Sequence, residues 1–101
     1  MKKLSLVCLL ALSGMVSPLV AAEPVKIGVL VGLSGPEGHI GEPSKAVAQM
    51  AAAEINAAGG ILGRPIELVF ADTQSNPGKA ALEAKRLIET EKVVAIAGPT
   101  G

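Results

Sequence analysis

One stretch restricts the possible folds of this chain more than any other. Residues 25–33 read VKIGVLVGL and are almost continuously apolar. A strand with one face in water alternates apolar and polar residues, whereas an unbroken apolar run is typical of a strand buried on both faces. Such a strand needs a layer on each side of its sheet, and helices supply those layers in α/β proteins. The sequence therefore predicts a three-layer α/β fold with a parallel sheet.

A first helix is expected from about Pro43 to Ala58, after an irregular loop at Ser34–Gly41 that holds three glycines and a proline. Apolar residues recur through this segment at helical spacing, which predicts one face turned toward the sheet. They are Val47, Met50, Ala51, Ile55 and Ala58. Gly59-Gly60 then ends the helix, because glycine accepts the left-handed conformation at that point.

Two further strands are expected at Ile66–Ala71 and Val93–Ala97. Between them, Asn76-Pro77 is a typical helix start, with a capping amide and a proline in the first turn. The inward face of this second helix is expected to carry Ala80, Ala84, Leu87 and Ile88. The order is thus strand, helix, strand, helix, strand. Right-handed crossovers in a sheet of order 2-1-3 would place the two helices on opposite faces.

The doubly wound arrangement also predicts where a ligand binds. Ligands of such sheets lie outside the carboxyl ends of the strands, at the point where the strand order reverses. Here that point falls between the first and third strands, bordered by the loops Ser34–Gly41 and Gly98–Gly101. Hydroxyl and backbone groups of Ser34, Gly35 and Thr100 are expected to hold a carboxylate or an amide.

A dinucleotide site is not expected. Gly28, Gly32 and Gly35 follow the first strand, but they lack the G-x-G-x-x-G spacing, and no helix is expected directly after Gly35. A phosphate needs the free N–H groups of a helix N-terminus.

Catalysis and metal binding are not indicated either. His39 is the single histidine, and it is interpreted as an exposed loop residue or a contact at the rim of the site. Ser34 shares its glycine-rich loop, so no rigid element fixes a catalytic arrangement of the two. Asp72 ends an outer strand and is expected to serve in loop hydrogen bonding. The residues indicate binding without reaction, and no cofactor.

The amino terminus resembles a secretory signal. Lys2 and Lys3 precede the charge-free run Leu4–Val20, and Ala22 offers a cleavage site, so residues 1–22 are predicted to be removed and residues 23–101 to form the mature domain. An uncleaved membrane anchor is the alternative, because 17 residues lie at the short end of what spans a bilayer. Cys8 lies inside the run and does not look like a lipidation site.

The composition of the mature chain limits the kinds of ligand and site that are expected. The 79 residues of the mature chain (101 minus 22) carry seven Lys/Arg and nine Asp/Glu, a net charge of −2, which gives no indication of nucleic-acid binding. They contain no cysteine, which excludes disulfides and zinc-thiolate sites. Phe70 is the single aromatic residue, so these residues alone offer little to stack on a ligand.

Three stretches resemble the amino-terminal segment of type I periplasmic solute-binding proteins of the leucine/isoleucine/valine-binding family, which serve ABC transporters. They read KIGVLVGLSGP, AAAEINAAGGILGRPIELVFADTQSNPGKA and LIETEKVVAIAGPTG. The most specific pieces are Leu33–Pro36, Glu54–Ile61 with Gly63-Arg64, Asp72–Pro77 and Gly98-Pro99.

The resemblance implies a periplasmic protein of two hinged lobes that closes on an amino acid or related solute and presents it to a membrane permease. Branched-chain or other amino acids, amides, urea and aromatic acids all occur as ligands in the family. Ile40 falls where many members place an aromatic residue over the ligand. The resemblance adds His39, Ile40, Pro99, Thr100 and Gly101 to Ser34 and Gly35 as ligand-binding candidates.

Family members are several times longer, so the chain is expected to be an amino-terminal fragment with little ligand affinity of its own. Two other classes of protein remain open at this point. A sensor would use the same lobe as its extracellular ligand-binding domain, and a transmembrane helix downstream would identify it. An enzyme with a flavodoxin-like half would retain a nucleotide or flavin on purification.

Overall fold

The computed structural model describes residues 22–99, so residues 1–21 of the predicted signal, Thr100 and Gly101 lie outside the described part. The elements are β1 (Val25–Val31), α2 (Gly38–Ala57), β2 (Ile66–Asp72), α3 (Pro77–Glu89) and β3 (Ala95–Ala97). The three strands form a parallel sheet of order β2-β1-β3, in which Ile27 of β1 lies opposite Leu68 of β2 and Ala95 of β3. The predicted fold class and strand order are confirmed.

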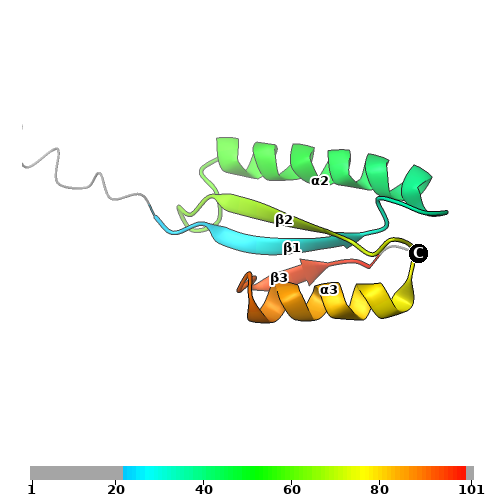
Figure 1. The fold of residues 1–101 in the computed structure, drawn as a ribbon. Helices are drawn as coiled ribbons and strands as arrows, with labels where there is room; N and C mark the ends of the chain where they lie inside the picture. The colour runs from blue at the N-terminus through cyan, green and yellow to red at the C-terminus, as the bar shows by residue number, and fades with distance from the viewer. Residues whose placement is uncertain (1–21, 100–101) are drawn as a thin grey trace, which may run out of the picture.

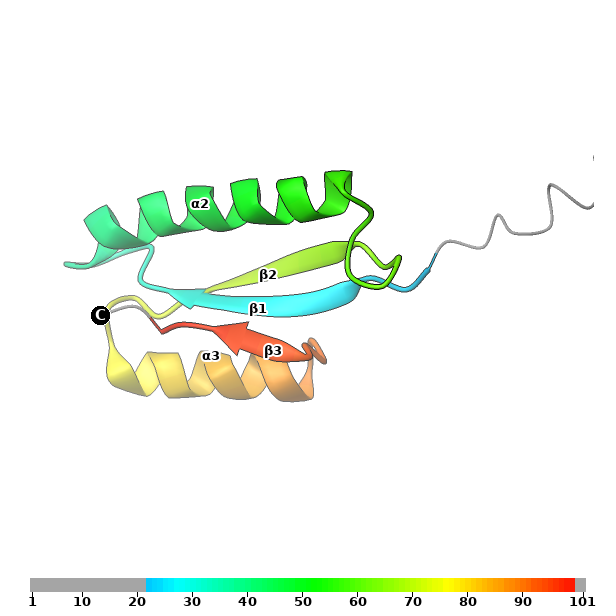
Figure 2. The same ribbon diagram turned by 180° about the vertical axis from the view of Figure 1, so that it is seen from behind.

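The sheet lies between the two helices. Figure 1 shows α2 over one face and α3 over the other, and the reverse view in Figure 2 shows the same layers. The centre of the core consists of Leu30, Ala71 and Leu87, and Val69, Ala80 and Ile96 pack around it. Neither helix of the described part has the length and apolar content of a membrane span.

Helix α2 begins at Gly38, not near Pro43 as predicted, and so replaces the last part of the expected loop. Its first turn closes through hydrogen bonds from the N–H groups of Ile40 and Gly41 to the carbonyl oxygen of Glu37, both 2.9 Å. Proline favours the first turn of a helix, which is why the sequence suggested a start there. In the structure Pro43 lies inside α2, where it removes one N–H donor.

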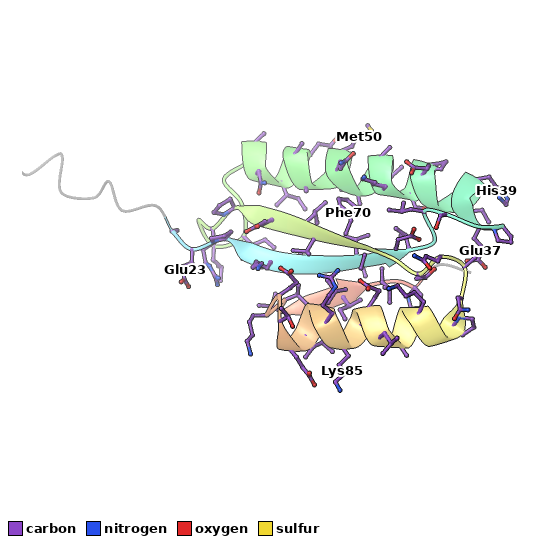
Figure 3. All side chains as sticks on the ribbon, in the orientation of Figure 1. Glu23, Glu37, His39, Met50, Phe70 and Lys85 are labelled. Carbon is purple, nitrogen blue, oxygen red and sulfur yellow. The ribbon has the colours of Figure 1, made fainter. Side chains whose placement is uncertain are left out.

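The face of α2 that meets the sheet also differs from the prediction. Val47 and Met50 are each 64% exposed, and Met50 points away from the sheet in Figure 3. Gly41 is buried instead, and Ala48 and Ala52 are half-buried on the same side. Glycine is required at position 41 because the helix approaches the backbone just after β1 so closely that a Cβ there would overlap the carbonyl oxygen of Gly32.

Helix α3 is closer to the prediction, because Leu87 is fully buried and Ala80 and Ala84 pack beside it. Ile88 is the exception, with 57% of its surface exposed. Strand β3 is shorter than the predicted Val93–Ala97. Val93 and Val94 lie before it: the N–H of Val93 donates to the carbonyl oxygen of Leu87 in α3, and that of Val94 donates to the carbonyl oxygen of Lys26 in β1.

Candidate functional site

The carboxylate of Asp72 joins the end of β2 to the loop after β1. Its Oδ1 accepts hydrogen bonds from the backbone N–H groups of Leu33 at 2.9 Å, Ser34 at 3.3 Å and Gln74 at 2.8 Å. Its Oδ2 accepts the Ser34 hydroxyl at 2.6 Å. These contacts lower the pKa of Asp72, the Ser34 hydroxyl having the largest effect. The role in loop hydrogen bonding expected for Asp72 is thus present.

Ser75 makes a second connection between the same two loops. Its hydroxyl donates to the carbonyl oxygen of Ser34 at 2.8 Å and accepts the backbone N–H of Glu37 at 3.0 Å. Gly35 lies against it with a φ of +79°, and a Cβ there would come within 2.9 Å of the Ser75 Oγ. Side chains at the end of β2 and just after it thus hold the loop after β1 in place through hydrogen bonds.

A cavity of about 260 Å³ opens beside these loops, at the carboxyl ends of the strands. The loops after β1, β2 and β3 and the first turn of α3 contribute its walls. In Figure 3, Glu37 lies at this end of the molecule, where α3 begins. The lining residues are Glu37, Thr73, Ser75, Asn76, Pro77, Ala80 and Pro99. Only one of these side chains, Glu37, carries a charge.

The structure places the predicted ligand-binding residues in three groups. Ser34 and Gly35 lie next to the cavity, in the loop fixed by Asp72 and Ser75. Pro99 lines the cavity. His39 and Ile40 lie in the first turn of α2, outside the cavity lining, and Nδ1 of His39 lies 2.8 Å from the carbonyl oxygen of Pro36. Thr100 and Gly101 are outside the described residues.

Three residues after β2 that line the cavity were not predicted from the sequence: Thr73, Ser75 and Asn76. Because β2 is an outer strand, its end was expected to lie away from the crevice. However, β2 pairs with β1 along its whole length, up to Val31 opposite Asp72, so the loops after the two strands emerge side by side. The stretch of hydroxyl and amide side chains at Thr73–Asn76 was the available signal.

A second cavity, of about 430 Å³, opens at the opposite, amino-terminal end of the sheet and includes Lys26, Arg64 and Lys92 in its lining. Two of these cations already have partners. Arg64 donates to the carbonyl oxygens of Glu23 and Pro24 at 2.8 and 3.3 Å, and Lys26 lies 3.5 Å from the Glu91 carboxylate. Ligands of doubly wound sheets bind at the carboxyl ends of the strands, which is the opposite end of the sheet from this cavity.

Among the described residues, no three His, Cys, Asp or Glu side chains lie close enough together to hold a metal ion. The single aromatic ring is used within the fold. Phe70 lies between β2 and α2 in Figure 3, and Nζ of Lys45 is 5.2 Å from the centre of its ring. The arrangement at the carboxyl ends is suited to binding a polar solute through hydrogen bonds.

The Asp72 carboxyl should titrate below about pH 3.9, the usual value for aspartate. Because its pKa is lower in the folded state, its contribution to stability is complete above the unfolded pKa and is lost as the pH falls through the folded value. A carbon-13 NMR titration of the side chain measures this midpoint, and Ser34→Ala should raise it. A midpoint at or above that of free aspartate would contradict the hydrogen bonding described here.

Comparison with known proteins gives consistent matches. A family model described as "Periplasmic binding protein" matches residues 24–101. An amino acid binding protein of Pseudomonas aeruginosa is 41% identical over 78 residues, which are 77% of this chain and 21% of the relative.

Two solved structures agree with the fold. The branched-chain amino acid transporter substrate-binding protein LivJ of Streptococcus pneumoniae, in complex with isoleucine, is 40% identical with a TM-score of 0.74, over 76% of this chain and 22% of that one. A putative branched-chain amino acid ABC transporter protein of Silicibacter pomeroyi is 49% identical with a TM-score of 0.71, over 73% and 19%. The chain thus spans about a fifth of the length of these proteins.

Proposed function

Since the chain belongs to the periplasmic binding protein family, we propose that residues 23–101 form the first part of the amino-terminal lobe of an extracytoplasmic solute-binding protein. In this proposal residues 1–22 are a cleaved signal, and the complete protein continues beyond Gly101 into a second lobe. The complete protein binds an amino acid and delivers it to the permease of an ABC transporter. It has no enzymatic activity.

The structural support for the proposal comes from one observation. The loops after β1 and β2 are connected by the side chains of Asp72 and Ser75, and beside them opens a cavity of about 260 Å³ with a polar and partly apolar lining. Fixed polar groups in a concave site suit a small solute. The matching relatives support amino acids as its class, because one is named an amino acid binding protein and another was solved with isoleucine.

Calorimetric titration of the complete protein with the twenty amino acids tests the proposal. The protein is first unfolded and refolded during dialysis, so that any solute retained from the cell is removed. We expect saturable binding of one molecule per protein for at least one amino acid, with branched-chain amino acids first among them. The absence of binding to every amino acid in a folded sample would contradict the proposal.

A second lobe that closes over the solute also predicts a change of shape. Small-angle scattering of the complete protein should show a smaller radius of gyration when the binding amino acid is present. An amino acid that gives no heat of binding is the matched control, and it should leave the radius unchanged.

A further inference from the structure

The side chain of Arg64 holds the two residues that precede β1. Its Nε donates to the carbonyl oxygen of Glu23 at 2.8 Å, and its Nη2 donates to that of Pro24 at 3.3 Å. Arg64 lies 41 and 40 positions further along the chain than these two residues. Figure 3 shows Glu23 at the end of the molecule where β1 begins. These two hydrogen bonds form a clamp, the Arg64 clamp, on the amino-terminal end of the domain.

The backbone of Arg64 is itself fixed by a tight turn. Its N–H donates to the carbonyl oxygen of Ile61 at 2.9 Å, and its own carbonyl oxygen accepts the N–H of Ile61 at 2.8 Å. Leu62 and Gly63, which lie between them, have φ values of +52° and +76°, and a two-residue type I′ turn requires positive φ at both positions. The side chain that forms the clamp therefore starts from a fixed point in the fold.

The clamp lies directly beside the bond that the sequence predicts to be cut. Cleavage after Ala22 adds water across the peptide bond to Glu23 and leaves a carboxylate on Ala22 and an ammonium group on Glu23. Only Pro24 then separates Glu23 from β1. Val25, the first residue of β1, is buried, and its N–H donates to the carbonyl oxygen of Pro65 at 2.7 Å. The bond to be cut thus lies next to the central strand of the sheet.

A protease acts on segments whose backbone is released from the fold, so hydrogen bonding of the backbone matters as well as exposure. Glu23 and Pro24 are exposed, but their carbonyl oxygens are held by Arg64. When a folded protein opens and closes quickly, the rate of cutting follows the fraction of molecules that are open. The Arg64 clamp lowers that fraction, because hydrogen bonds from a charged donor are stronger than those between neutral groups.

Resting on the cleaved signal of the proposed function, we propose that the signal is removed before the Arg64 clamp forms, and that the clamp makes the folded precursor a poor substrate for the signal peptidase. Cutting is then confined to chains that have not yet folded. After cleavage, the same two hydrogen bonds hold the new amino terminus against the domain. Arg64 is thus a positioning residue for the mature end of the chain.

The test compares two samples of the complete precursor, both first unfolded in urea. One is diluted directly into purified signal peptidase in detergent, and the other is allowed to refold before the peptidase is added. Mass spectrometry follows the appearance of chains that begin at Glu23. We expect the refolded sample to be cut about tenfold more slowly or less. Arg64→Ala should raise the rate in the refolded sample about tenfold, as expected for the loss of hydrogen bonds from a charged group, and should not change the rate in the other sample.

Lys92→Ala is the matched control, because Lys92 is an exposed cation in the lining of the same cavity as Arg64. This variant should leave both rates unchanged. Hydrogen exchange of the refolded precursor separates a local effect from a general loss of stability. In Arg64→Ala the amide of Val25 should exchange about tenfold faster, whereas that of Leu30, at the centre of the core, should keep its rate.

Three results would overturn the inference. The refolded and the directly diluted precursor could be cut at the same rate, or Arg64→Ala could leave the refolded precursor as slow as the unchanged protein. An equal increase in exchange at Val25 and Leu30 would mean that Arg64→Ala acts on the whole domain. In these cases cleavage between Ala22 and Glu23 still occurs, and the proposed signal stands. If neither sample is cut at this bond, the proposed signal and the inference both fail, while amino-acid binding is tested separately by calorimetry.

Discussion

Gly41→Val in the complete protein should lower the free energy of unfolding by about 3 kcal/mol or more, the upper range for overpacking. Gly41 is buried where α2 crosses the end of β1, and a Cβ there would overlap the backbone carbonyl oxygen of Gly32. A side-chain clash can be relieved by a change of rotamer, but a clash with backbone moves the helix. Since α2 begins three residues before Gly41, the same displacement would disturb the loop that carries Ser34.

Urea unfolding followed by circular dichroism measures this loss. Ala53→Val is the matched control, because it introduces the same side chain on the exposed side of the same helix. Ala53→Val should lower the free energy of unfolding by no more than the difference in helix propensity between alanine and valine, about 0.5 kcal/mol. If Gly41→Val and Ala53→Val had equal effects, α2 would not lie against β1 as described.

Leu87→Ala should lower the free energy of unfolding by about 2–5 kcal/mol, the range for deleting a buried leucine side chain. Leu87 is fully buried at the centre of the core, between α3 and the sheet. Its methyl groups lie so close to β1 that a Cβ on Gly28 would be 3.0 Å from one of them. Gly28, which lies against Leu87, has no side chain that could move into the cavity left by the alanine.

Leu82→Ala is the control for this experiment, since Leu82 belongs to the same helix and is 65% exposed. Leu82→Ala should change the free energy of unfolding by no more than about 0.5 kcal/mol, as most surface substitutions do. Urea unfolding of the two variants at constant pH measures this difference, because the midpoint should fall much further for Leu87→Ala than for Leu82→Ala. A loss below about 1 kcal/mol for Leu87→Ala would place the core elsewhere.

Hydrophobic patterning was enough to predict the layers and the strand order, but not the inward side of α2. The unbroken apolar run of β1 required cover on both faces, and the covering helices are present. On α2, the larger apolar residues at 47 and 50 suggested a face that is in fact exposed. The distance between helix and sheet is set by Gly41, and small residues have too weak a periodic signal to show that closeness in advance.

The sequence predicted a site at the carboxyl ends of the strands, and of its candidate residues only Pro99 lies in the lining of the cavity found there. The strand order placed it at the carboxyl ends, where the cavity with Pro99 opens. The hydrogen bond from the Ser34 hydroxyl to Asp72, which helps to hold the loop beside the cavity, joins residues 38 positions apart in the chain. Such a contact requires the register of β1 with β2, which hydrophobic periodicity alone does not give.

The central claim is that an amino acid binds at the carboxyl ends of the strands, and amide NMR spectra of the complete protein during titration with the binding amino acid test it directly. The account predicts that the largest shift changes within residues 22–99 fall on the backbone amides of Leu33, Ser34, Gln74 and Ser75, which belong to the two connected loops. Largest changes instead at Lys26, Arg64 and Lys92, around the cavity at the opposite end, would contradict it.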